Sequence, residues 1–305
     1  MIAAQVAAAP GQTAPEAPKN VQTVPRVPGV RTLFKGLNAG VTYSAVHNSV
    51  IGWYTILTPA ISYTFSQHYS ADVSGSLYLH RLIENHNPAT ASTEHLVVDE
   101  ASAGDMLLGF HATFLPKSLL DTVTAYLTAP TGDSSAGLGT GKFSFDISNH
   151  TEKYFNQIGL LLDLGAGNSS NVSNNLVNQN YSSSGGLAHF QTGAILWLPM
   201  HSYFESTAYE DLPMGSQTVY NAVGSQGSSP QPPSGANYAE DNGFINFAGI
   251  PLTDHITFSG YYNRSLRRQT DTVSFGITYV LRGTHRDKHQ SMIDRAIREA
   301  EKATP

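Results

Sequence analysis

The chain contains no cysteine and is poor in charge. Charged residues make up 13% of its 305 residues, whereas about a quarter is usual for a soluble protein. The lack of cysteine excludes disulfides, thiolate-bound metal and covalently attached haem. No apolar run reaches about 18 residues, so no transmembrane helix is expected. With 17 basic and 23 acidic residues the net charge is -6, which argues against a nucleic-acid partner.

What the chain does contain is a recurring alternation of apolar and polar residues. In TDTVSFGITYVL (270–281), Phe275 and Ile277 alternate with Ser274 and Thr278. A period of two predicts a β-strand with one apolar and one polar face. The same pattern predicts about twelve strands, at 37–45, 51–65, 69–80, 105–114, 119–129, 142–149, 154–165, 186–198, 203–210, 243–250, 255–263 and 271–282.

The links between these strands alternate in length. Every second link is predicted to be a tight turn, at 66–68, 115–118, 150–153, 199–202 and 251–254. The others are mostly long and polar, at 81–104, 130–141, 166–185 and 211–242. Sorting of this kind is typical of an outer-membrane barrel, with short periplasmic turns and long external loops. We therefore expect an all-β, transmembrane, antiparallel up-and-down barrel in a Gram-negative envelope, with membrane lipid outside, a lumen inside and both termini in the periplasm.

Aromatic residues concentrate near both ends of the predicted strands. Those near the short turns are Phe65, Tyr69, Phe114, Tyr154 and Trp197. Those near the other end are Tyr43, Trp53, Phe143, Tyr209 and Phe244. Two belts at the lipid headgroup layers would explain this distribution. The alternative is that aromatic residues simply favour strands.

Composition divides the chain into three parts. Residues 1–34 are rich in alanine and proline and are expected to form a disordered periplasmic segment. Residues 35–282 carry the barrel pattern. Residues 283–305 are charged, and the spacing of Met292, Ile293 and Ala296 predicts a short amphipathic helix in this tail.

Three glycine-rich stretches resemble a known family. They are AGDMLLGFHATF (103–114), TAYLTAPTGD (124–133) and GLGTGKFSFDIS (137–148). This arrangement is similar to the MetA-like family of outer-membrane β-barrel transporters, named for the meta-pathway of phenol degradation. The resemblance implies a porin-like channel for small solutes, with hydrophobic or aromatic compounds as the substrate class. From the residues themselves, the glycines and Pro130 are best explained by backbone structure at strand ends.

The predicted function is passive uptake or efflux of small solutes through the lumen, without catalysis or cofactors. Strand parity places the candidate lumen and substrate-pathway residues at Tyr78, His80, Asp105, His111, Tyr126, Lys142, Asp146, Asp163, His189, Gln191, Glu205 and His255. Asp72 falls on the same face. The histidines and carboxylates lack tight ligand spacing, so polar lining is a better explanation than a metal site.

Two other classes of function remain open at this point. A surface-exposed structural or binding protein would use the long loops, such as 168–186 and 224–243, although these contain few apolar anchors. An outer-membrane lipid hydrolase would pair a histidine with a serine, and His47 and Ser49 stand two residues apart. No glycine-flanked serine elbow accompanies them. The channel is therefore favoured, the binding protein is second and the hydrolase third.

Overall fold

A computed structural model describes the chain at residues 37–49, 52–66, 68–87, 92–98, 101–114, 119–133, 138–139, 141–155, 157–168, 181–221 and 240–281. The expected N-terminal segment and C-terminal helix lie outside these ranges. Within them, no helix is both long and apolar enough to cross a membrane.

The described residues are almost entirely strands. In chain order these are β1 (Leu37–Asn48), β2 (Gly52–Thr64), β3 (Tyr69–Ser74), β4 (Leu77–Asn87), β5 (Ser92–Val98), β6 (Ser102–Ala103), β7 (Met106–Phe114), β8 (Leu119–Ala129), β9 (Ser144–Phe155), β10 (Ile158–Gly167), β11 (Tyr181–Trp197), the short helix η1 (Pro199–His201), β12 (Tyr203–Asn221), β13 (Asp241–Pro251), β14 (Ile256–Ser265) and β15 (Thr270–Val280).

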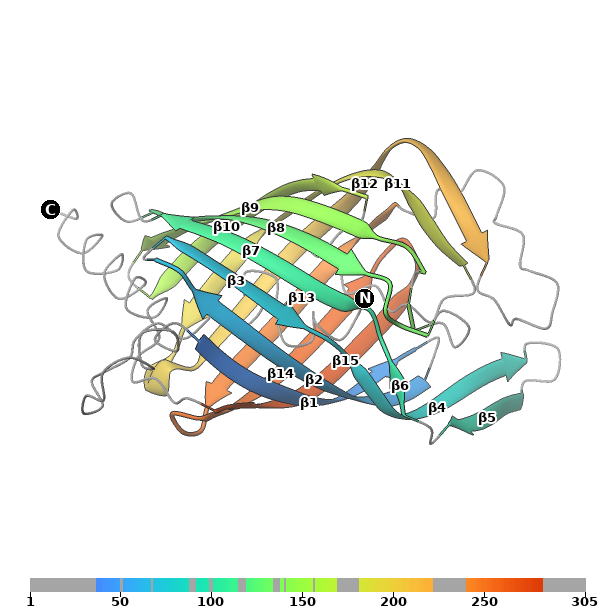
Figure 1. The fold of residues 1–305 in the computed structure, drawn as a ribbon. Coiled ribbons are helices and arrows are strands. Elements are labelled where there is room, and N and C mark those ends of the chain that lie inside the picture. The colour runs from blue at the N-terminus through green and yellow to red at the C-terminus, as the bar shows by residue number, and fades with distance from the viewer. Residues whose placement is uncertain are drawn as a thin grey trace, which may run out of the picture.

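These strands close into one antiparallel barrel (Figure 1). Closure occurs at β1, which pairs with β15 on one side and with β2 on the other. Next to β2, the segments β3 and β4 share one position in the wall, interrupted at Gly75. The segments β5, β6 and β7 likewise follow one another beside them. The wall therefore has 12 strands, and the predicted fold class is confirmed.

Several predicted boundaries were wrong. Residues 150–153 are not a turn, because β9 continues to Phe155 and β10 starts at Ile158. The stretch 81–104, expected to be a loop, contains the β4–β5 hairpin. The strands β11 and β12 extend into regions that were also expected to be loops. In Figure 1 both hairpins project from the end of the barrel opposite η1.

The outer face of the barrel is apolar, as the period-two pattern predicts. Outward side chains include Phe110, Leu162 and Phe275, which are 47%, 42% and 54% exposed. An apolar outer surface on a closed sheet suits a hydrocarbon environment, where unpaired strand edges would be costly. Three expected belt residues were placed on the wrong face. Tyr154 and Tyr209 are buried inside the barrel, and the partly buried Trp197 packs against the same inner cluster.

The inner face along β8 to β14 is filled by large side chains. We call this the filled wall, and its apolar residues are Leu120, Tyr154, Leu161, Ile195, Tyr203, Tyr209, Ile245, Phe247 and Tyr261. Glycines make room for these side chains. A Cβ at Gly159 would lie 2.6 Å from Ile195 Cγ2, and a Cβ at Gly249 would lie 2.4 Å from Tyr203 Cε1. The large side chains therefore occupy interior space that small residues leave free.

The inner face of β15, β1, β2 and β3 is different. Apart from Val46, Tyr54 and Ile56, which also face inward, it carries small residues and hydroxyl groups. We call this the open wall. Thr42 and Thr278 hydrogen-bond across β1 and β15, with their hydroxyl oxygens 2.9 Å apart. Further along the same two strands, Asn48 Nδ2 donates to Thr272 Oγ1 at 2.9 Å. These pairs hold the seam of the barrel without filling its interior.

Candidate functional site in the barrel interior

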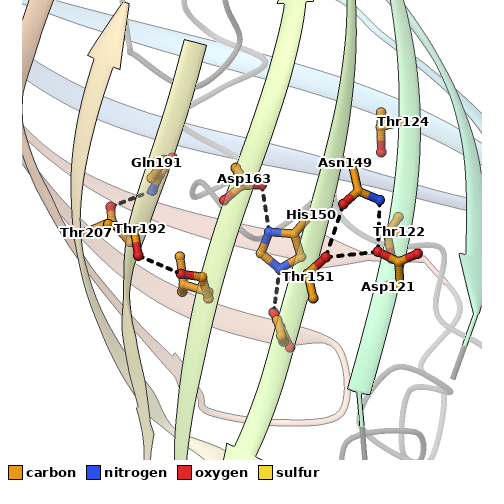
Figure 2. Close-up of polar contacts among 12 residues, drawn as sticks. Asp121, Thr122, Thr124, Asn149, His150, Thr151, Asp163, Gln191, Thr192 and Thr207 are labelled. Atoms are coloured by element: carbon orange, nitrogen blue, oxygen red, sulfur yellow. Dashed lines mark hydrogen bonds and ion pairs between the residues drawn. The ribbon is translucent and has the colours of Figure 1, made fainter. Parts of the chain in front are cut away.

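A buried polar network lies on the filled wall, centred on His150 (Figure 2). The ring Nδ1 of His150 lies 2.7 Å from Asp163 Oδ1, and Nε2 lies 2.8 Å from Glu152 Oε1. The Tyr154 hydroxyl donates to the other oxygen of Glu152. Carboxylates accept hydrogen bonds only, so the ring satisfies both contacts when both of its nitrogens carry protons. The network thus ties β9 to β10 through side-chain hydrogen bonds.

A second set of polar groups continues along the same wall. His189 Nε2 lies 2.6 Å from Asp146 Oδ1, which joins β11 to β9. Gln191 is fully buried and donates to the Thr207 hydroxyl on β12 at 2.5 Å. Glu205 is 2% exposed and lies within electrostatic range of His150 and Asp163. Asp146, Asp163, His189, Gln191 and Glu205 therefore all occur together in the interior, as their parity predicts.

A separate pair lies between the two walls. His111 on β7 places Nε2 at 3.1 Å from Asp72 Oδ1 on β3, and Nδ1 at 3.1 Å from Thr124 Oγ1 on β8. The ring of Tyr126 meets the His111 ring edge to face, with centroids 5.7 Å apart. These contacts fix the imidazole across three neighbouring strands. His111 and Tyr126 both face the interior, as predicted.

Asp105 belongs to a glycine-rich loop cluster, in which the link between β6 and β7 contacts the link between β8 and β9. Its Oδ1 accepts a hydrogen bond from the Gly132 amide at 2.9 Å. The Asp133 amide donates to the Ala103 carbonyl at 3.0 Å. A Cβ at Gly139 would lie 2.6 Å from Asp105 Oδ1, so these glycines are needed for close approach. This loop cluster supports a structural role for the glycines of the three sequence motifs.

Tyr78 packs beside this loop cluster and is 3% exposed. A Cβ at Gly104 would lie 3.1 Å from its ring. Its neighbour across β2 is Tyr54, with ring centroids 6.0 Å apart. Arg81, which the parity analysis did not select, is also buried here at 7% exposed. The interior beside the loop cluster is therefore lined by two tyrosines, the Asp105 carboxylate and the Arg81 guanidinium.

Three of the predicted lumen residues are exposed. His80 is exposed because Leu79 forms a bulge against β2, so Tyr78 and Arg81 point inward and His80 does not. Lys142 precedes β9 and is exposed. His255 lies in the β13–β14 turn, where Nδ1 is 2.9 Å from the Val280 carbonyl. These three residues were wrongly assigned to the interior face.

His150, Glu152 and Tyr154 are further interior residues that were not selected from strand parity. The composition of HTEK (150–153) predicts a turn, and a turn would interrupt the alternation of inward side chains at this point. A period-two signal is present there, since His150, Glu152 and Tyr154 are spaced two apart on the face that Asp146 and Ser148 begin. Following that parity past residue 149 would have found all three.

A cavity lies beside the open wall, with a volume of about 30 Å³. It is lined by Asn38, Ala39, Gly40, Val41, Thr42, Ala60, Ser62, Asp72, Ser74, Thr278 and Val280. The lining is made of short side chains, hydroxyl groups and a single carboxylate. A volume of this size has room for about two water molecules, since one water needs about 10–15 Å³.

Among the described residues, no group of three or more histidine, aspartate or glutamate side chains is arranged to hold a metal ion. The Ser49 hydroxyl accepts a hydrogen bond from the Asp271 amide at 3.0 Å. The His47 ring lies against Trp53, with centroids 4.7 Å apart. The His-x-Ser pair thus has structural contacts at the end of β1.

The sequence matches no protein-family model and no curated protein sequence. Solved structures do share its fold. An outer membrane channel from Pseudomonas putida F1 is similar over 81% of this chain and 96% of its own, with a TM-score of 0.53 and 13% identity. The NanC porin is similar over 78% of this chain and 98% of its own, with a TM-score of 0.46 and 7% identity. The first of these likenesses shows a common barrel fold.

Proposed function

We propose that the protein is a channel of the bacterial outer membrane that lets small solutes pass by diffusion. The observation that carries this proposal is a closed barrel with an apolar outer face and a cavity inside, bordered by the hydroxyl groups of the open wall. The fold shared with an outer membrane channel supports it. Because β1 begins and β15 ends at the short-turn end, both termini belong on the periplasmic side of such a barrel.

Hydrophobic and aromatic solutes are the proposed substrate class. The resemblance of residues 103–148 to the MetA-like family supports this choice. Short apolar side chains, such as Ala60 and Val280, border the cavity together with hydroxyl groups, so this part of the interior offers both apolar and polar contacts. The interior polar residues, including Asp146, Asp163, His189, Gln191 and Glu205, would act by shaping and charging the pathway. No catalytic step is assigned to them.

Reconstitution tests the proposal. The purified protein is inserted into planar lipid bilayers and into liposomes, with heat-unfolded protein as the control. Discrete conductance steps are expected, together with liposome swelling in small neutral solutes that slows as solute size increases. If a barrel that runs as a folded, heat-modifiable band gives neither current nor swelling, the channel proposal is wrong.

The projecting hairpins favour one alternative, a binding protein of the cell surface. The β11–β12 hairpin continues as far as the Tyr181–Asn221 pair, well past the strand lengths of its neighbours. Shortening the two strands at this end, by deleting 181–185 and 215–221 and rejoining the chain at each deletion, separates the two functions. A channel retains its conductance, whereas a binding protein without pore activity shows none before or after the deletion.

A further inference from the structure

Four inward residues form one row across the seam of the barrel. Tyr54 on β2 is the register partner of Val46 on β1. Val46 also pairs with Ser274 on β15, and Ser274 pairs with Tyr261 on β14. All four side chains are buried, so the row faces the interior. It has two short side chains in its middle and a tyrosine at either end.

The two tyrosines approach each other across this row. Neighbouring strands lie about 4.8 Å apart, so about 14 Å of wall separates the backbone of β2 from that of β14. Inward side chains of a closed barrel converge toward its axis, and Tyr54 lies within electrostatic range of Tyr261. Tyr54 faces inward from β2, whereas Tyr261 belongs to the filled wall. The open wall and the filled wall therefore approach each other at these two rings.

A third ring lies on the other side of Tyr54. Tyr78 on β4 places its ring centroid 6.0 Å from that of Tyr54, with the planes inclined by 42°. Behind Tyr78 stands the glycine-rich loop cluster. A Cβ at Gly104 would lie 3.1 Å from Tyr78 Cε2 and 3.5 Å from the Leu138 carbonyl oxygen. The loop cluster thus limits movement of Tyr78 away from Tyr54.

The neighbouring rows of the same wall carry shorter side chains. One row nearer the short turns, β1 and β15 carry Ser44 and Gly276, with Ile56 beside them on β2. One row nearer the other end, β1 and β15 carry Asn48 and Thr272. The tyrosines are the largest buried side chains of β14, β15, β1 and β2. These four strands therefore project farthest into the interior at the level of the tyrosine row.

We propose that Tyr54, Tyr78 and Tyr261 form the constriction of the pathway and set the largest solute that passes. The inference rests on the proposed channel function, because it names the residues that determine its size limit. A barrel of 12 strands lies between eight-stranded barrels, which side chains fill, and sixteen-stranded porins, which are open. At this width a few large rings suffice to narrow the lumen, and they act through their volume.

Single-channel conductance and liposome swelling test this constriction. Tyr54→Ala and Tyr261→Ala each remove one ring and should raise the conductance about twofold or more, because the narrowest section limits flux. Swelling in arabinose and in sucrose, each relative to swelling in glycerol, should become faster in the same variants. Unchanged conductance together with unchanged relative swelling in both variants would overturn the constriction.

Three further variants separate a constriction from a general loosening of the interior. Tyr54→Phe keeps the ring and should conduct as the native protein does. Tyr203→Ala removes an equally large ring from the filled wall, where Tyr203 packs between Trp197 and Phe247, and should also stay near native. Tyr279→Ala changes an outward ring that is 43% exposed. An increase in Tyr203→Ala or Tyr54→Phe as large as that in Tyr54→Ala would contradict the proposal.

The constriction and the channel can fail separately. If the native barrel conducts and the folded alanine variants conduct equally, only the constriction is wrong. If the native barrel gives no current and Tyr54→Ala does, these rings close the interior, and the channel proposal is wrong for the native chain. If no folded variant conducts, both proposals are wrong. Where an alanine variant gives no heat-modifiable band, leucine replaces alanine, with a smaller increase in conductance expected.

Discussion

The two walls of the barrel interior follow the same alternating pattern but differ in side-chain volume. On the filled wall, Tyr154, Phe247 and Tyr261 belong to one buried apolar cluster, and Tyr154 also bonds to Glu152 of the His150 network. On the open wall, Thr42 and Thr278 meet only at their hydroxyl oxygens. Both walls are polar enough to line a lumen. The comparison teaches that residue size, more than polarity, decides where space remains for a solute.

The largest expected effect comes from breaking the network of the filled wall. His150→Ala removes the ring between Glu152 and Asp163 and leaves two buried carboxylates facing each other. Removing one partner from a buried charged pair costs about 3–5 kcal/mol in the free energy of unfolding. Urea unfolding of the lipid-reconstituted protein, followed by the heat-modifiable band, measures this loss.

The matched control for this variant is another histidine. His80→Ala changes an exposed side chain, so its unfolding free energy should stay within about 0.5 kcal/mol of the native value. Equal losses for the two variants would show that the His150 contacts do not stabilise the filled wall.

A smaller loss is expected from adding one methyl group to the filled wall. In Gly159→Ala the new Cβ would lie 2.6 Å from Ile195 Cγ2 and 2.9 Å from Tyr154 Cε1. Overpacking of this kind costs about 1–3 kcal/mol. Gly75→Ala provides the comparison, because nothing lies within 4 Å of the Cβ it would add. Similar midpoints for the two variants in urea would contradict the close packing described for this wall.

The variant expected to change the free energy of unfolding least lies on the open wall. It tests the proposed transport directly. Ser62→Trp places a large ring beside the cavity and should reduce single-channel conductance by about tenfold, because pore width limits flux. The neighbouring variant Ile61→Trp puts the same ring on the outer face, where Ile61 is 50% exposed. Its conductance should stay native. Unchanged current in Ser62→Trp would place the pathway elsewhere.

The strands and their faces were predictable because period-two alternation is a local property of the chain. Phe275 and Ile277 point outward and Ser274 points inward, as their spacing indicates. The predicted faces and boundaries were wrong where the period-two alternation is interrupted or hidden by a polar composition. One extra residue at Leu79 reverses the face of His80. In HTEK (150–153), a strand rich in polar residues has the composition of a turn.

The contacts of the interior could not be predicted, because they depend on register between strands. His150 meets Asp163 since β9 and β10 pair those two positions directly. Asp72 lies over Gly109 for the same reason on β3 and β7. A single sequence gives the parity of each strand but not its offset from the next. The difference between the filled and open walls follows from these offsets, together with side-chain volume.

Thiol accessibility tests the central claim most directly, since the native chain has no cysteine. Thr278→Cys places a thiol on the cavity side of the open wall, and Thr207→Cys places one in the filled wall, where Thr207 is 3% exposed. In reconstituted protein, a small neutral methanethiosulfonate added to the aqueous phase should modify Cys at 278 much faster than Cys at 207. Equal rates at the two positions would contradict a pathway along the open wall.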